Sequence, residues 1–88
     1  MRFAIIGGDL RQIIIARSLK SKLNEVITFG LGKNDGLIEA ESLAKAINRS
    51  DAIILPLPVS RDSISVNAPL SDEKIILQDI NILTNIKN

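Results

Sequence analysis

The sequence has 88 residues, enough for one small domain, and its 45% hydrophobic and 24% charged residues are typical of a folded globular protein. A net charge of +1, from 11 basic and 10 acidic residues, offers no basic surface for nucleic acid or an anionic membrane. The lack of cysteine and histidine excludes disulfides, thiolate chemistry and imidazole as a general base or metal ligand.

The first predicted element is a strand over residues 3–6, because this apolar run is continuous, as in strands buried on both faces of a parallel sheet. Gly7 and Gly8 end the strand in a tight turn, and a helix is expected over about residues 9–22 with Asp9 as its N-cap. Helical spacing assigns the buried face of this helix to Ile15, Ala16, Leu19 and Leu23, widened by Ile13 and Ile14.

A second strand is predicted over residues 25–29, where β-branched residues dominate, and a glycine-rich turn follows it. A second helix is predicted over about residues 39–49, followed by a third apolar strand over 52–55. The second helix takes its apolar stripe from Ala40, Leu43, Ala44 and Ile47. This β-α-β-α-β pattern predicts a Rossmann-like three-layer α/β half unit with a parallel sheet in the order 2-1-3.

The segment after the third strand is stiffened by Pro56 and Pro58, which fix φ and remove two amide donors. Short β-like runs at 64–66 and 75–77 are expected to form a small hairpin. Asp79 is expected to cap a last helix that carries Ile82, Leu83 and Ile86. Such a helix normally leads into a fourth parallel strand, so we expect residues 1–88 to be one domain of a longer protein.

The turn at Gly7-Gly8 does not carry a dinucleotide fingerprint, which needs G-x-G-x-x-G. Gln12 stands at the last glycine position, and Asp9 places a negative charge where a phosphate would lie. The second strand ends at Phe29 with no acidic residue to hold a ribose, and no P-loop is present. We therefore expect no cofactor to bind to this chain, no metal site and no nucleophile–base pair.

Polar side chains follow both the first and the third strand, which are neighbours in the predicted sheet. Asp9, Arg11 and Gln12 follow the first, and residues 60–62 follow the third, so both loops face one crevice at the carboxyl ends of the strands. Arg11 or Arg61 is suited to pair with a ligand carboxylate in a forked geometry. The alternatives are that the arginines form surface ion pairs with Asp9 or Asp62, and that the glycines and prolines only shape turns.

The pattern I-I-G-G-D-x-R-Q at residues 5–12 resembles the start of the dipicolinate synthase A-subunit, and residues 51–58 resemble that family's third strand and proline turn. Residues 60–62, 67–69 and 70–75 resemble its clostridial-type members. The resemblance implies an N-terminal, substrate-side domain whose substrate-binding residues are Gly7, Gly8, Asp9, Arg11, Gln12, Pro56, Ser60 and Arg61.

The same resemblance implies that a separate C-terminal domain binds NADP and that the partner is the flavoprotein-like B-subunit of dipicolinate synthase. Together they oxidise a dihydrodipicolinate-type precursor, a small dicarboxylate, to dipicolinic acid during sporulation, in the cytoplasm of the mother cell. This chain alone is expected to be inactive.

A different class of function is a flavodoxin-like or receiver-like interaction module, but a receiver needs an acidic pocket, and here Asp9 is the single acid after the first strand. Self-association through an unpaired sheet edge is a third hypothesis. The apolar run at the amino terminus is too short for a signal peptide and no stretch has the length of a membrane span, so we expect a cytoplasmic protein.

Overall fold

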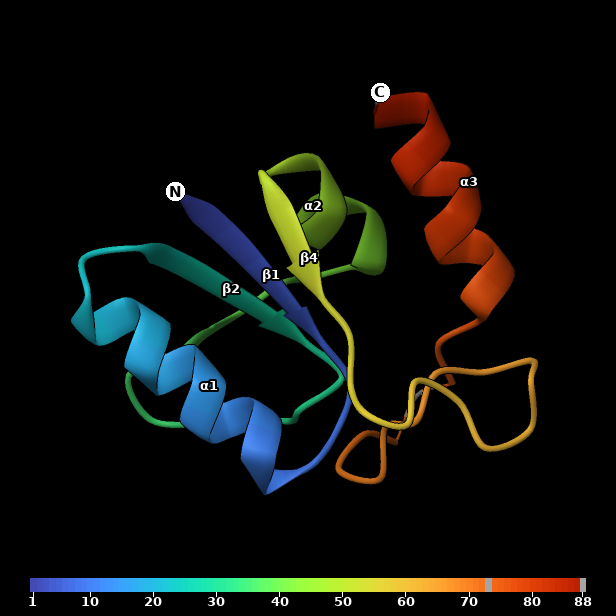
Figure 1. The fold of residues 1–88 in the computed structure, drawn as a ribbon, viewed down its shortest axis with the longest axis horizontal. Coiled ribbons are helices and arrows are strands. Elements are labelled where there is room, and N and C mark those ends of the chain that lie inside the picture. Colours follow the sequence, from blue (N-terminus) through green and yellow to red (C-terminus); the bar gives the residue numbers. More distant parts are fainter. Residues whose placement is uncertain (73, 88) are drawn as a thin grey trace.

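The computed structural model describes residues 1–72 and 74–87 and shows a four-stranded parallel sheet flanked by helices (Figure 1). The strands lie in the order β3-β2-β1-β4, and every pair of neighbours is parallel. Their bounds are Arg2–Ile6 for β1, Glu25–Phe29 for β2, Ile38–Glu39 for β3 and Ala52–Ile54 for β4.

The predicted order 2-1-3 is confirmed, with the first strand between the second and the strand at Ala52–Ile54. The register places Ala4 of β1 opposite Ile27 on one side and Ile53 on the other. The carboxyl ends of β1 and β4 are therefore adjacent, and the loops that leave them begin side by side.

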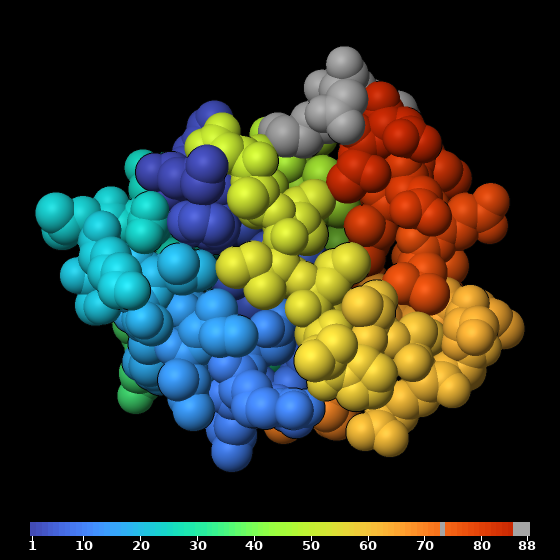
Figure 2. All heavy atoms as spheres, in the orientation of Figure 1, coloured from blue at the N-terminus to red at the C-terminus, as the bar shows by residue number. Residues whose placement is uncertain are grey.

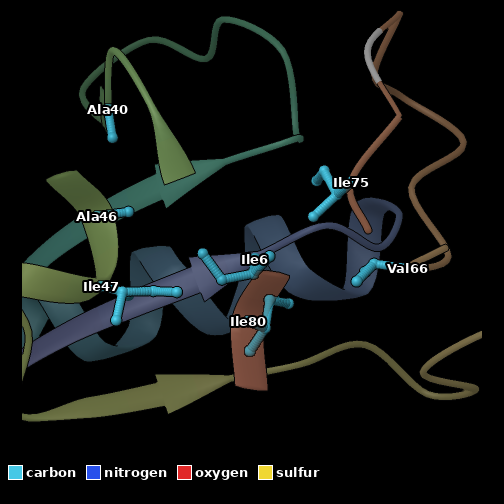
Figure 3. Packing of buried hydrophobic residues seen from close by; sticks show 8 residues of the cluster. Ile6, Ala40, Ala46, Ile47, Val66, Ile75 and Ile80 are labelled. Atoms are coloured by element: carbon cyan, nitrogen blue, oxygen red, sulfur yellow. The ribbon is translucent and has the colours of Figure 1, made fainter. Parts of the chain in front are cut away.

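Helices cover both faces of the sheet, which confirms the three-layer α/β architecture (Figure 1). On one face, Ile13 and Ala16 of α1 (Leu10–Ser21) pack with Ile5 and Val26 of the sheet. The other face carries α2 (Leu43–Asn48) and α3 (Leu77–Lys87). There, Figure 3 shows Ala46 and Ile47 of α2 and Ile80 of α3 gathered around Ile6 of β1.

The N-cap of α1 is Asp9, as predicted: its carboxylate accepts a hydrogen bond of 3.0 Å from the backbone N–H of Arg11. The predicted buried face is wrong in part. Leu23 is 95% exposed because it lies beyond the end of α1, with φ 66°, where the chain turns towards β2. Ile14 and Ile15 are 66% and 39% exposed, so neither belongs to the buried face, whereas Gln12 and Ile13 are buried.

The second helix is shorter than predicted, because its expected first turn belongs to the sheet. Ile38 of β3 pairs with Ile27 of β2, and the N–H of Ala40 donates to the carbonyl of Thr28 at 2.7 Å. The helix begins only at Leu43, after an N-cap at Ser42. Ala40 is buried as predicted, but as an extension of the sheet edge, so its apolar spacing alone did not distinguish strand from helix.

The two β-like runs after β4 meet, but in one isolated antiparallel bridge between Ser65 and Ile76. A hydrogen bond of 2.7 Å from the N–H of Val66 to the carbonyl of Ile75 supports it. The side chains of Val66 and Ile75 are buried in the core over α2 and α3 (Figure 3). The predicted hairpin is therefore reduced to this one bridge, which holds Val66 and Ile75 together at the carboxyl end of the sheet.

The last helix exists, but it begins at Leu77, so that Asp79 lies in its first turn and not at the cap. Its inward residues are Ile80 and Leu83, while Ile82 is 48% exposed. The expectation for Ile86 concerns a side chain outside the described part of the structure. Within the described residues, no helix has the length and apolarity to span a membrane.

Candidate functional site

The turn after β1 is built from two glycines in the left-handed region, with φ 65° at Gly7 and 91° at Gly8. Their N–H groups donate at 2.7 Å to the carbonyls of Phe29 and Asn67, respectively. A Cβ on Gly7 would lie 2.8 Å from Cγ1 of Val66 and 3.0 Å from the carbonyl oxygen of Asn67. Glycine is required there because residues 66–68 pack directly on the turn.

The packing of residues 66–68 on this turn also limits the space in which a dinucleotide phosphate could bind. In dinucleotide-binding folds, glycines in this turn let a pyrophosphate approach the backbone and the start of the helix. Here the N–H of Gly8 is bonded to Asn67, and residues 66–68 fill the space beside Gly7. The residues of this turn do not fit a dinucleotide phosphate, so we assign no cofactor chemistry to them.

A hollow of about 250 Å³, which we call the β1–β4 hollow, lies between the turn after β1, the start of α1 and the segment after β4. Figure 2 shows the surfaces of the first turn of α1 and of residues 55–59 adjoining on one face of the molecule. The lining residues are Gly8, Asp9, Arg11, Gln12, Ile15, Ile54, Leu55, Pro56, Leu57 and Asn67. The structure thus brings five of the eight predicted site residues together in one place.

Gln12 lies at the base of this hollow and is only 4% exposed. Its side-chain amide donates to the carbonyl of Ile54 at 3.4 Å, which ties α1 to the end of β4. A Cβ on Gly8 would overlap Cγ of Gln12 and approach Cβ of Pro56 to 3.0 Å. Gly8 is therefore needed for the buried position of Gln12 as well as for the turn.

Arg11 forms the polar rim of the hollow. Its Nε and Nη2 donate at 3.2 Å to the two carboxylate oxygens of Asp9, and Nη2 also donates at 3.0 Å to the carbonyl of Leu57. The side-chain hydrogen bonds are the main reason that the pKa of Asp9 is lowered and the pKa of Arg11 is raised. Arg11 therefore links the start of α1 to the loop after β4, and the ion pair with Asp9 is formed.

Ser60 and Arg61 are not among the residues that line the β1–β4 hollow. Arg61 lines a neighbouring hollow of about 360 Å³ and donates from Nε to Oδ1 of Asn67 at 3.3 Å. The hydroxyl of Ser60 donates within its own loop, to the carbonyl of Ser65. Asn67 lines both hollows, so it is the residue through which Arg61 adjoins the site at Arg11.

Asp62 organises the loop that carries Ser60 and Arg61. Its carboxylate accepts hydrogen bonds from the backbone N–H groups of Ser65 at 2.8 Å and Ile64 at 2.9 Å, and from the Ser65 hydroxyl at 2.9 Å. These bonds, above all those from the backbone, lower the pKa of Asp62 strongly. Asp62 therefore shapes the loop instead of pairing with an arginine.

Asn67 is the residue that the sequence analysis did not single out. Its carbonyl accepts from Gly8, its N–H donates to the carbonyl of Val59 at 2.7 Å, and its side-chain amide donates to the carbonyl of Pro58 at 3.2 Å. The sequence signals only a turn at 67–69, because the partner Gly8 lies far away along the chain. Among the described residues, no cluster of acidic side chains is arranged to hold a metal ion.

Comparison with known proteins identifies the family. The sequence matches, over residues 2–88, the family described as the N-terminal domain of the dipicolinate synthase A-subunit. The chain belongs to this family. That confirms the resemblance read from residues 5–12 and 51–58, and it places the β1–β4 hollow within the matched region.

Two solved structures of the family have the same fold. The chain is 27% identical to dipicolinate synthase, A chain, from Bacillus subtilis, with a TM-score of 0.71, and the match covers 90% of this chain and 28% of that one. It is 30% identical to the dipicolinate synthase A-subunit from Bacillus halodurans, with a TM-score of 0.68, and the match covers 86% of this chain and 27% of that one. The chain thus spans little more than a quarter of their length. No match was found among curated protein sequences.

Proposed function

We propose that this chain is the substrate-binding domain of a dipicolinate synthase-type oxidoreductase and that the β1–β4 hollow takes one carboxylate of a small dicarboxylate. The observation that carries the proposal is the family match over residues 2–88, together with Arg11 at the rim of a hollow within that region. Guanidinium groups bind carboxylates through parallel N–H bonds, which gives both affinity and orientation.

The hollow suits part of a small ligand. Its volume of about 250 Å³ lies just below the range of about 300–1,000 Å³ that is usual for complete small-molecule sites. Its walls combine polar groups from Arg11 and Asn67 with apolar surface from Ile15 and Leu57. A flat ring with carboxylates at its edge matches these walls, and we propose that another polypeptide covers the remainder of the ring.

The proposed reaction is the oxidation of a dihydrodipicolinate-type precursor to dipicolinic acid, in which the ring loses two hydrogens and becomes aromatic. NADP held by a separate domain is the proposed acceptor, and this chain contributes binding and orientation of the substrate. Arg61, in the neighbouring hollow, is the proposed second cation for the distal carboxylate.

The proposed setting follows from the same family. We propose that the partner is a flavoprotein-like B-subunit and that the location is the cytoplasm of the mother cell of a sporulating bacterium. Neither proposal rests on the geometry of the hollow, so both are independent of the ligand assignment.

Isothermal titration calorimetry tests the ligand assignment. Dipicolinate is expected to bind the wild-type domain, and Arg11→Gln is expected to weaken binding about tenfold or more, because a hydrogen-bonded charge is lost. Arg49→Gln is the control, since Arg49 lines a different hollow together with Arg2 at the start of β1. Equal binding by Arg11→Gln, or tight binding of NADP to this domain, would contradict the proposal.

A further inference from the structure

The hydrogen bonds of Arg11 account for three of its five N–H donors. Nε–H and one N–H of Nη2 point to the carboxylate of Asp9, and the second N–H of Nη2 points to the carbonyl of Leu57. Only the two N–H groups of Nη1 have no partner among the described residues. The guanidinium is thus largely occupied by groups of the chain itself.

The distribution of these bonds closes both forks of the guanidinium. A carboxylate binds an arginine in two parallel bonds either along the Nε–Nη2 edge or along the Nη1–Nη2 edge. Asp9 takes the first edge, and the carbonyl of Leu57 takes the Nη2 donor that the second edge needs. A ligand carboxylate therefore gains a forked contact with Arg11 only if one of these two partners leaves.

We propose that Asp9 occupies Arg11 in place of the ligand carboxylate and that the ligand displaces it, so that Asp9 sets how strongly an anion must bind to enter the hollow. This inference rests on the proposed function. The contact with Asp9 is the one that breaks more readily, because it joins two exposed side chains, whereas the competing acceptor is a main-chain carbonyl in the segment stiffened by Pro56 and Pro58. Water then replaces the lost bonds at both groups.

Asp9 retains a second role after such an exchange. Its Oδ1 accepts a bond of 3.0 Å from the backbone N–H of Arg11 as the N-cap of α1 and also accepts a bond from Nε, so the exchange moves the guanidinium and leaves Oδ1 on the backbone N–H. The helix therefore begins at the same residue in both states. The negative charge of Asp9 also stays at the rim, where it repels a weakly held anion.

The test separates this role from one in which Asp9 merely orients Arg11. Asp9→Asn keeps the N-cap, because asparagine caps helices as well as aspartate does, but it removes the competing charge. We expect Asp9→Asn to bind dipicolinate about two- to fivefold more tightly than the wild type, the range that an exposed ion pair supplies. If Asp9 only orients Arg11, the same variant must bind more weakly.

The matched control is the other bonded arginine–aspartate pair. Arg2 and Asp51 form an ion pair of 3.2 Å at the opposite end of the strands, so Asp51→Asn removes a similar charge away from the hollow and is expected to leave the affinity unchanged. Asp9→Ser, which also caps a helix, guards against a specific effect of asparagine. Thermal unfolding of each variant checks that the fold is retained.

Each outcome decides a different point. Tighter binding by both Asp9 variants, or binding that appears only in them, supports the displacement. Equal or weaker binding by them beside a wild type that binds overturns it and leaves the proposed function intact. Absence of binding in every form overturns the proposed function, and this inference fails with it. A gain that Asp51→Asn shares shows a general charge effect and also overturns the inference.

Discussion

Replacing Gly7 by alanine tests whether residues 66–68 really pack on the turn after β1. The new Cβ would lie 2.8 Å from Cγ1 of Val66 and 3.0 Å from the carbonyl oxygen of Asn67. That carbonyl already accepts a bond of 2.7 Å from Gly8, so it cannot withdraw without breaking the bond. The substitution must therefore strain the turn and also displace residues 66–68, which pack on it.

The expected cost has two parts. Alanine at φ 65° costs about 1–2 kcal/mol relative to the right-handed region, and forcing a methyl group into packed atoms typically costs about 1–3 kcal/mol. The sum is roughly 2–5 kcal/mol, a large share of the roughly 4–13 kcal/mol expected for a domain of 88 residues. At about 4–8 °C per kcal/mol, we expect the Tm to fall by roughly 8–40 °C.

Gly36→Ala isolates the packing part. Gly36 also has a positive φ, 78°, but a Cβ there would have Arg17 Nη1 as its nearest neighbour, at 3.9 Å. The control therefore carries only the conformational cost of about 1–2 kcal/mol. Urea unfolding followed by circular dichroism measures both variants against the wild type. Equal losses of stability in the two variants would refute the packing of residues 66–68 on Gly7.

Three further predictions concern the loop at Asp62, the end of α1 and the buried face of α1. Because hydrogen bonds lower the pKa of Asp62 in the folded state, its carboxylate stabilises the fold at pH values above its ordinary pKa of 3.8, and this stabilisation is lost as the pH falls below about 4. Asp62→Asn should therefore flatten the acid limb of a plot of Tm against pH. Parallel curves for the variant and the wild type would exclude the bonds from Ser65. Leu23→Gly should stabilise by about 0.5–1 kcal/mol, because Leu23 is 95% exposed at φ 66° just after α1, and a lower Tm would contradict this. Ile13→Ala should cost about 2–5 kcal/mol in urea unfolding, whereas Ile14→Ala, at a site that is 66% exposed, should stay within about 0.5 kcal/mol; the reverse order would overturn the orientation of α1.

Strands β1 and β4 could be predicted from the sequence because they are short, continuous apolar runs followed by glycine or proline. Residues 3–6 and 52–55 have no alternation, which is the pattern of strands covered on both faces, and the structure places them side by side as β1 and β4. The paired glycines and the N-cap at Asp9 then locate the turn and the helix start. These signals are local, because each depends only on residues that are close together in the sequence.

The errors arise where a local pattern was ambiguous or where distant contacts decide. The spacing of Ala40 suits a helix and an extended sheet edge equally, and the bond from its N–H to Thr28 is what selects the sheet. Four consecutive apolar positions around Ile13 and Ile15 allow several buried faces, and the packing on Ile5 selects one of them. Periodicity carries no information about either contact.

The candidate site could also be predicted only where local signals were sufficient, and not where long-range contacts decide. Neighbouring strand ends predict that Asp9, Arg11 and Gln12 meet residues 60–62, and the structure places the first three around the β1–β4 hollow but brings Pro56 and Leu57 there in place of residues 60–62. Ser60 lies elsewhere because Asp62 and Ser65 close their own loop around it. The position of Asn67 in the site depends on a long-range backbone hydrogen bond from Gly8, and no residue type specifies such a bond.

The most direct test of the account is a titration of the isotope-labelled domain with dipicolinate, followed by the amide signals in a ¹H–¹⁵N NMR spectrum. We predict that the largest shifts belong to Gly8, Arg11, Gln12 and Asn67, which surround the β1–β4 hollow. Shifts confined to residues of the separate hollow at Glu41 and Asp72, or a spectrum that dipicolinate leaves unchanged, would contradict the assignment of the ligand to this hollow.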